Sequence, residues 1–139
     1  MFPSVMYAVT GRHFQRKEAV LSRFARFAVR GEVYPGIVER EGASTDGILY
    51  FDVDVCSLSR LDDFEGDLYR RISVEVKDTG GGQFAAFAYE IKPWKADRLS
   101  GAVWDVREFE GHLDYFIKHY EGFLTVRSDK RKRPEESLG

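Results

Sequence analysis

The chain has 139 residues, of which 43% are hydrophobic, including 11 Phe, 7 Tyr and 2 Trp. This length suits a single domain, and the aromatic content excludes a chain that stays disordered throughout. The formal charge of −2 predicts no general affinity for nucleic acid or anionic membranes. Cys56, the only cysteine, excludes an intramolecular disulfide and suits a reducing cytoplasm. The amino-terminal segment lacks the basic start of a signal peptide, so we expect a cytoplasmic protein.

Strand patterns dominate the first two-thirds of the chain. Residues 21–30 are the exception, because their apolar side chains recur at helical spacing and favour a helix on pattern alone. Residues 33–39 read as extended, since Pro35 keeps the residue before it out of the helical region. The pair Asp46-Gly47 is a turn signal. Residues 48–53 follow it as a run that is apolar on both faces at its centre, which predicts an interior strand.

A short helix follows this strand. Ser57 or Ser59 can cap it, its apolar side chains include Leu61, and Glu65 is its last residue because Gly66 would end it. The sequence therefore predicts that Glu65 sits at a helix end.

A β-hairpin comes next. Residues 69–77 alternate polar and apolar side chains, which predicts a half-buried strand. Residues 78–82 (DTGGG) turn the chain, and residues 83–91 form the returning strand. The glycine run joins two strands and opens no helix, so it is a turn and not a phosphate-binding loop.

The last third changes period. From Asp105, a plausible N-cap, apolar residues recur at helical spacing as far as Leu124 and predict one amphipathic helix. We expect residues 1–124 to form one domain and residues 125–139 to be a disordered charged tail. The basic cluster of this tail is either solvated or a contact for a polyanion.

The histidines show no spacing typical of metal ligands, and we expect neither a metal nor a cofactor. They are His13, His112 and His119.

Glu65 is the clearest candidate for a catalytic group in the sequence. It follows Phe64 and precedes Gly66, so its side chain can point away from the helix and toward aromatic side chains. A carboxylate there can carry protons when desolvation raises its pKa, whereas one on a solvated helix face is an ordinary surface charge. Asp62 and Asp63 are expected on an exposed helix face or at a cap, and their charge would also raise the pKa of Glu65.

Four motifs in this order resemble the gamma-glutamylcyclotransferase-like family over about residues 1–124. They are YPGIV at 34–38, GILY at 47–50, LDDFEG at 61–66 followed by Tyr69 and Arg70, and a hairpin strand that contains Ala88-Tyr89. The resemblance implies an α+β fold, a small mixed β-barrel of about five to six strands with flanking helices. It also implies that residues 21–30 form a strand, which overrides the helical pattern.

The resemblance implies a reaction. Members of the family cyclise a gamma-glutamyl amine or amino acid to 5-oxoproline and release the amine, and Glu65 matches the position of their general acid/base. The expected partner is this small molecule rather than nucleic acid or a membrane. The alternative is a non-catalytic small-molecule-binding or interaction protein on the same fold.

Four further residues are candidates for substrate binding, each with a structural alternative. Tyr69 could bind a substrate carboxylate, or it could simply pack. Tyr34 and Gly36 could line the pocket, since glycine lets a ligand approach the backbone, or they could mark a strand kink. Tyr89 is a further pocket candidate.

The chain lacks one family motif, a Tyr-Gly-Thr-Leu or Tyr-Gly-Ser-Leu turn that offers N–H groups to the substrate's α-carboxylate. Either the natural protein starts upstream of Met1 and carries this turn, or the chain is truly short and has lost part of its grip on substrate. The first explanation is favoured, because a missing interior strand would leave unpaired backbone on both neighbours. We expect a monomer, with a strand-swapped dimer as the alternative for a short chain.

Overall fold

The computed structural model describes residues 1–32 and 34–112. Its elements, in chain order, are α1 (Pro3–Thr10), β1 (Arg16–Val29), β2 (Pro35–Tyr50), α2 (Val55–Glu65), the 3-10 helix η1 (Gly66–Leu68), β3 (Tyr69–Asp78), β4 (Gln83–Ile91), the 3-10 helix η2 (Pro93–Arg98) and β5 (Leu99–Val103). Residues 106–112 are helical as well. None of the helices in these ranges has the length and hydropathy that a membrane crossing requires.

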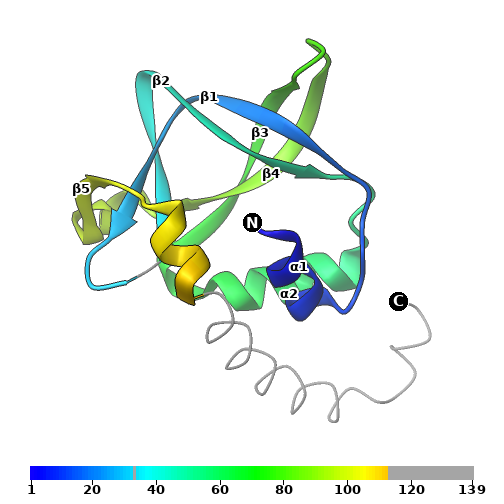
Figure 1. The fold of residues 1–139 in the computed structure, drawn as a ribbon, viewed down its shortest axis with the longest axis horizontal. Helices are drawn as coiled ribbons and strands as arrows, with labels where there is room; N and C mark the ends of the chain where they lie inside the picture. Colours follow the sequence, from blue (N-terminus) through cyan, green and yellow to red (C-terminus); the bar gives the residue numbers. More distant parts are fainter. Residues whose placement is uncertain (33, 113–139) are drawn as a thin grey trace.

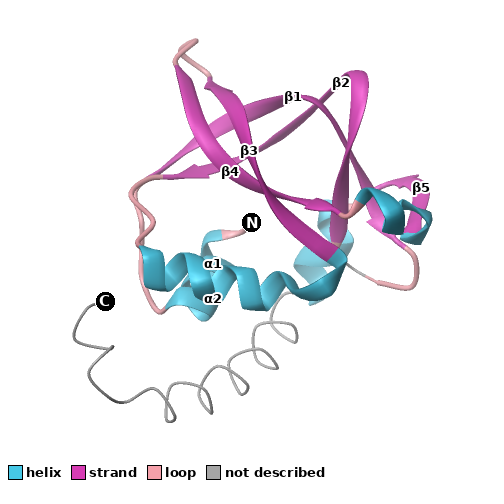
Figure 2. Cartoon of the chain, turned by 180° about the vertical axis from the view of Figure 1, so that it is seen from behind, coloured by secondary structure: helices cyan, strands magenta, loops and turns pink. Residues whose placement is uncertain are grey.

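The five strands form one strongly curved sheet in the order β2-β1-β3-β4, with β5 paired to β1. The long strand β1 pairs with β2 over most of its length, with β3 near its start and with β5 at its end. Helices α1 and α2 lie together against one end of this sheet (Figures 1 and 2). The α+β class is therefore confirmed. The described pairings are all antiparallel, so a mixed sheet is not observed, and they do not by themselves show a closed barrel.

Strand β1 contains the residues whose apolar spacing resembled a helix. The register between β1 and β2 shifts between Ser22 and Phe24, and Arg23 adopts a φ of 72° there. Four residues of β2, at 40–43, stand opposite this single residue of β1, so the extra residues belong to β2. The left-handed Arg23 nevertheless interrupts the extended conformation of β1, and the two-residue alternation of its side chains changes there. The pattern-based helix is wrong, and the strand implied by the resemblance is confirmed.

Strand β2 joins two segments that the sequence analysis separated by a turn. Asp46 pairs with Val20 and Gly47 with Ala19, so the predicted turn lies inside a continuous strand. The interruption comes earlier, where residues 40–43 stand opposite Arg23 of β1 and Gly42 has a φ of 82°. The expectation of an interior strand is also wrong, since β2 stands at the end of the strand order.

Helix α1 was not predicted. Pro3 occupies its first turn, where a missing N–H costs nothing. The left-handed Gly11 ends it and donates its N–H to the Tyr7 carbonyl at 2.7 Å. These two residues explain how so short a segment becomes a helix.

Helix α2 ends at Gly66 as predicted, but its cap is Asp54. Ser57 donates to that carboxylate through its N–H at 3.1 Å and through its Oγ at 2.7 Å. The serine predicted as the cap is therefore the donor to it. Asp105 does cap the helix at 106–112, because its Oδ1 accepts from the Arg107 N–H at 2.9 Å.

The hairpin of β3 and β4 is confirmed, with Tyr69 paired to Ile91 at its base. The remainder of the predicted C-terminal helix, His119 and the expected tail at 125–139 lie outside the described residues.

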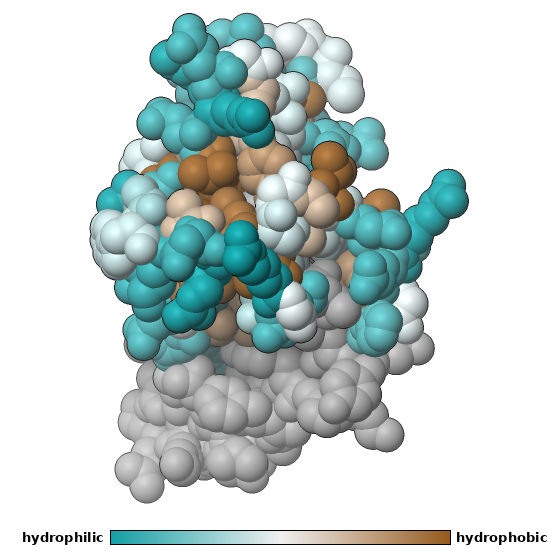
Figure 3. Space-filling model, turned by 90° about the vertical axis from the view of Figure 1, so that its left-hand side faces the viewer, coloured by the Kyte–Doolittle hydropathy of each residue, from teal (hydrophilic) through white to brown (hydrophobic). Residues whose placement is uncertain are grey.

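Two clusters of buried side chains form the core. The first joins α1, α2 and the helix at 106–112 through Val5, Met6, Val9, Leu61 and Phe109. The second joins β1, β4 and β5 through Val29, Ile91 and Leu99. Tyr34 packs against both clusters. Apolar side chains also reach the surface in the middle of the face shown in Figure 3.

Candidate active site

Glu65 is the last residue of α2, and Gly66 turns the chain out of the helix with a φ of 69°. Strand β3 begins directly after the short η1, so Glu65 lies between the helix end and the base of the hairpin. Its side chain is partly buried, whereas Asp62 and Asp63 on the preceding turn are exposed. At the end of α2, Glu65 is thus less exposed than the carboxylates of the preceding turn.

Burial raises the pKa of Glu65 from its usual 4.5 to about 7. The α-amino group of Met1 lowers this pKa and the charge of Asp62 raises it, both by less than burial does. Near neutral pH the acid and carboxylate forms of Glu65 are therefore similarly populated. A group in this state can accept a proton in one step and return it in the next.

The amino-terminal segment lies close to Glu65. Burial lowers the pKa of the Met1 amino group, and the Glu65 charge opposes that change. The Tyr50 hydroxyl donates to the Met1 carbonyl at 2.7 Å, and Figure 1 shows the amino terminus between the sheet and the helices. The first residue of the described chain therefore lies near Glu65 in this structure.

Tyr69 and Tyr89 also lie in the field of Glu65. Burial, followed by other effects that include the Glu65 charge, raises the pKa of the Tyr69 phenol. Burial and the hydrogen bond to Asp62 raise the pKa of the Tyr89 phenol, with a smaller contribution from Glu65. The structure therefore brings both predicted tyrosines to the predicted acid/base.

The hydroxyls of these two tyrosines have partners within the protein. Tyr69 donates to the Pro35 carbonyl at 2.6 Å, which ties β3 to β2. Tyr89 donates to Asp62 Oδ1 at 2.5 Å. Tyr34 is half-buried, and like Tyr69 it packs against the core cluster of Val29, Ile91 and Leu99. Burial raises the pKa of Tyr34 itself. Whether any of the three tyrosines binds a substrate stays a prediction.

Gly36 has a packing reason to be glycine. It is buried, and a Cβ there would stand 3.0 Å from Leu99 Cδ2 and 3.5 Å from Ile91 Cβ. The space over this glycine is thus filled by the second core cluster. Its role in substrate binding stays a prediction.

Asp62 and Arg71 are the residues of this region whose contacts sequence reasoning missed. Asp62 is exposed and its charge raises the pKa of Glu65, both as expected. Its hydrogen bond from Tyr89 and its ion pair with Arg71 Nη1, the latter at 3.2 Å, were not predicted. Two signals could have found this cluster. Asp62 precedes Glu65 by three residues, so both lie on one helix face. Arg71 and Tyr89 occupy paired positions in the predicted hairpin.

Two surface cavities lie away from Glu65. One, of about 390 Å³, is lined by Arg12, His13, Phe14, Gln15, Phe51 and Asp52. The other, of about 450 Å³, lies along β1, β2 and β5. Neither contains any of the five predicted site residues. The assignment of the site therefore rests on the chemistry of Glu65 and not on cavity size.

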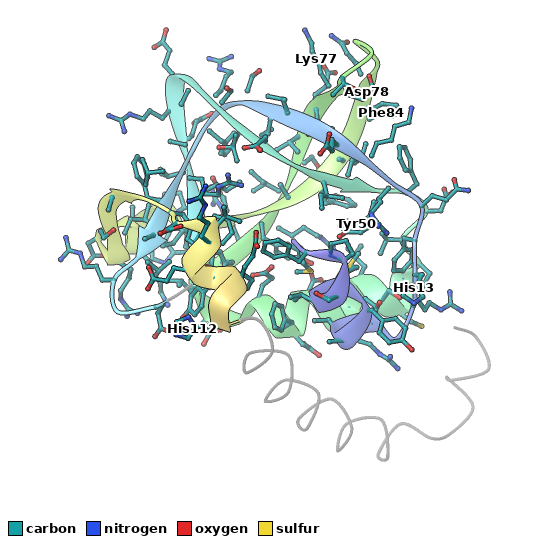
Figure 4. All side chains as sticks on the ribbon, in the orientation of Figure 1. His13, Tyr50, Lys77, Asp78, Phe84 and His112 are labelled. Atoms are coloured by element: carbon teal, nitrogen blue, oxygen red, sulfur yellow. The ribbon has the colours of Figure 1, made fainter. Side chains whose placement is uncertain are left out.

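The histidines do not converge on a site. His13 stacks on Tyr7 with ring centres 4.4 Å apart, and His112 Nδ1 lies 2.9 Å from the Glu108 carbonyl. Figure 4 shows these two histidines on opposite sides of the molecule. Within residues 1–32 and 34–112, no group of three or more His, Cys, Asp and Glu side chains could hold a metal ion.

Known proteins resemble this chain over most of its length. A family model described as "Gamma-glutamyl cyclotransferase, AIG2-like" matches residues 1–106. AIG2-like protein C of Arabidopsis thaliana is 30% identical over 134 residues, covering 96% of this chain and 76% of that protein. AIG2-like protein B of the same plant is 29% identical over 132 residues, covering 93% of this chain and 74% of that protein.

Solved structures share the fold. A solution structure of an Arabidopsis thaliana protein superimposes with a TM-score of 0.64 at 26% identity, covering 91% of this chain and 85% of that one. A structure titled gamma-glutamyl cyclotransferase superimposes with a TM-score of 0.55 at 17% identity, covering 66% of this chain and 64% of that one. The second likeness concerns the fold alone.

Proposed function

This chain belongs to the gamma-glutamyl cyclotransferase, AIG2-like family, and we propose that it cyclises a gamma-glutamyl amine or amino acid to 5-oxoproline, releasing the amine. The proposal depends chiefly on Glu65, which is a partly buried carboxylate. Burial raises the pKa of this carboxylate to about 7. In this proposal Glu65 is the general acid/base, and the protein acts in the cytoplasm on a small molecule.

The proposed reaction forms one bond and breaks one. The α-amino nitrogen of the substrate attacks the γ-carbonyl carbon, the ring closes, and the amide bond to the leaving amine breaks. Glu65 takes a proton from the α-ammonium group and gives one to the leaving nitrogen, so the reaction consumes no water. Both reacting groups belong to one molecule, so holding it folded supplies much of the acceleration.

The surroundings of Glu65 suit this role. Tyr34, Tyr69 and Tyr89 would border the substrate. Their half-buried rings would limit the access of water, which favours cyclisation over hydrolysis.

The alternative function is binding without turnover on the same fold. It is favoured by the hydroxyls of Tyr69 and Tyr89, which already donate hydrogen bonds to Pro35 and Asp62. Under this alternative Glu65 would stabilise a bound amine and would not move a proton.

Release of 5-oxoproline from a panel of gamma-glutamyl amines and gamma-glutamyl amino acids tests the proposal. We expect turnover by the unaltered chain and a loss of about a hundredfold or more in Glu65→Gln, the range for removal of a general acid/base. Asp67→Asn is a matched control, since it removes an exposed carboxylate two residues further on. Binding of a panel member without release by either protein would favour the alternative.

A further inference from the structure

Asp62 lies one helical turn before Glu65 and uses both of its carboxylate oxygens. The Tyr89 hydroxyl donates to Oδ1 at 2.5 Å. Arg71 Nη1 lies 3.2 Å from Oδ2. An exposed carboxylate held from two directions is better defined in position than one that makes a single surface ion pair, which contributes little. Asp62 is therefore fixed although it is exposed.

Both partners of Asp62 belong to the rigid hairpin. Arg71 on β3 and Tyr89 on β4 are direct partners in the strand register. The Arg71 guanidinium also lies over the Phe87 ring, 4.7 Å from its centre, which limits its freedom. The hairpin thus presents a hydroxyl and a guanidinium side by side, and the last turn of α2 is attached to both.

We propose that Asp62 is a positioning residue for Glu65: it anchors the end of α2 to the hairpin and keeps a negative charge beside the acid/base, while Arg71 and Tyr89 moderate that charge. The proposal rests on the proposed function of Glu65, and it adds a second carboxylate with a separate role. In this proposal Asp62 acts through Glu65 and does not itself react.

The groups that act on Glu65 come from several elements. The charge of Asp62 raises the pKa of Glu65, and the amino group of Met1 lowers it. The phenols of Tyr69 and Tyr89 face Glu65 from β3 and β4 and are neutral near pH 7. Arg71 acts through Asp62, since its positive charge offsets part of the Asp62 charge.

Opposite changes in this cluster should have opposite effects. Asp62→Asn removes the negative charge and should lower the pKa of Glu65. Arg71→Gln removes the positive charge that offsets the charge of Asp62, and it should raise the pKa of Glu65. Tyr89→Phe removes one hydrogen bond to Asp62 while keeping the ring, and should raise it slightly. A purely structural role of Asp62 would not give this pattern of signs.

Carboxyl-carbon NMR titration of the full chain measures the midpoint of Glu65 directly, with Glu65→Gln to identify its signal. We expect a downward shift of about half a pH unit in Asp62→Asn and a smaller upward shift in Arg71→Gln, because solvent screens these partly exposed charges. Glu75→Gln removes an exposed carboxylate further along β3 and should leave the midpoint unchanged. If Asp62→Asn does not fold, Arg71→Gln and Tyr89→Phe still give the upward shift.

Unchanged midpoints in Asp62→Asn and Arg71→Gln, or shifts of the same sign in both, would overturn the proposal. The pH profile of 5-oxoproline release should move with the NMR midpoint. If the opposite shifts occur but no gamma-glutamyl compound is turned over, the coupling of Asp62 to Glu65 is supported and the proposed reaction is the part that fails.

Discussion

The Tyr89 hydroxyl on β4 donates a hydrogen bond of 2.5 Å to Asp62 on α2. This contact joins the sheet to the last turn of the helix from which Glu65 projects. Glu65 is thus held by two features, a glycine that ends the helix and a hydrogen bond that fixes the preceding turn. The predictions below test the residues that maintain this arrangement.

Glu65→Gln should change stability in a pH-dependent way. The folded-state pKa of Glu65 is raised to about 7, so the folded chain holds this proton more tightly than the unfolded chain does. The stability gained from this tighter proton binding is fully present below the unfolded-state pKa, near 4.5. It is lost as the pH rises through the folded-state pKa of about 7. Glutamine stays neutral at every pH. The unfolding free energy of Glu65→Gln, taken relative to that of the unaltered chain, should therefore be about 2–3 kcal/mol higher at high pH than at low pH.

Urea unfolding of both proteins between about pH 4.5 and pH 8.5 measures this difference. A difference in unfolding free energy that stays constant over this range would mean that the folded-state pKa of Glu65 is ordinary.

Asp54→Ala should destabilise the chain by about 1 kcal/mol, because it removes the cap of α2. Burial alone would raise the pKa of Asp54, but the hydrogen bonds from Ser57 and the charge of Arg12 outweigh it and lower this pKa. The stabilisation from Asp54 should therefore be lost as the pH falls through the range where carboxylates protonate. Thermal unfolding of Asp54→Ala and Asp54→Asn compares these effects. Equal stability of Asp54→Ala and the unaltered chain would show that the cap contributes nothing.

Tyr69→Phe should cost about 1–2 kcal/mol of unfolding free energy, since it leaves the partly buried Pro35 carbonyl without its donor. Chemical denaturation measures this loss, and the KM for a turned-over gamma-glutamyl compound serves as the second readout. Unaltered stability combined with a raised KM would instead assign the hydroxyl to substrate binding.

Gly36→Ala should destabilise the chain by about 1–3 kcal/mol, because the new Cβ would press on Leu99 Cδ2 at 3.0 Å. Gly47→Ala in the same strand is the matched control, since nothing lies within 4 Å of its Cβ position. The control should change the unfolding free energy little. Equal effects of the two substitutions would show that Leu99 moves aside without cost.

The hairpin and the end of α2 were predictable because local chemistry determines them. The alternation in residues 69–77, the DTGGG turn and Gly66 each act within a few residues. The helix cap was missed because Asp54 and Ser57 are both good capping residues, and the sequence does not show which one donates. Helix α1 was missed because eight residues give too short a pattern to recognise.

Long-range pairing explains the remaining errors. The left-handed conformation of Arg23 interrupts the alternation of β1, and only its pairing with β2, β3 and β5 makes it a strand. The Asp46-Gly47 pair is a turn signal by itself, but its pairing with Val20 and Ala19 outweighs that preference. Asp62 is exposed as expected, but its contacts with Arg71 and Tyr89 were missed because these residues come from another element. The local sequence around Glu65 is enough to make it a candidate, whereas the contacts of Asp62 depend on the folded hairpin.

The pH dependence of kcat/KM for 5-oxoproline release tests the central claim most directly. A general base must be deprotonated in the free enzyme, so activity should be lost on acidification with an inflection near the Glu65 pKa of about 7. Glu65→Gln should lose that inflection together with most of the activity. An inflection near the usual glutamate value of 4.5, or the same profile in Glu65→Gln, would contradict the assignment of Glu65 as the acid/base.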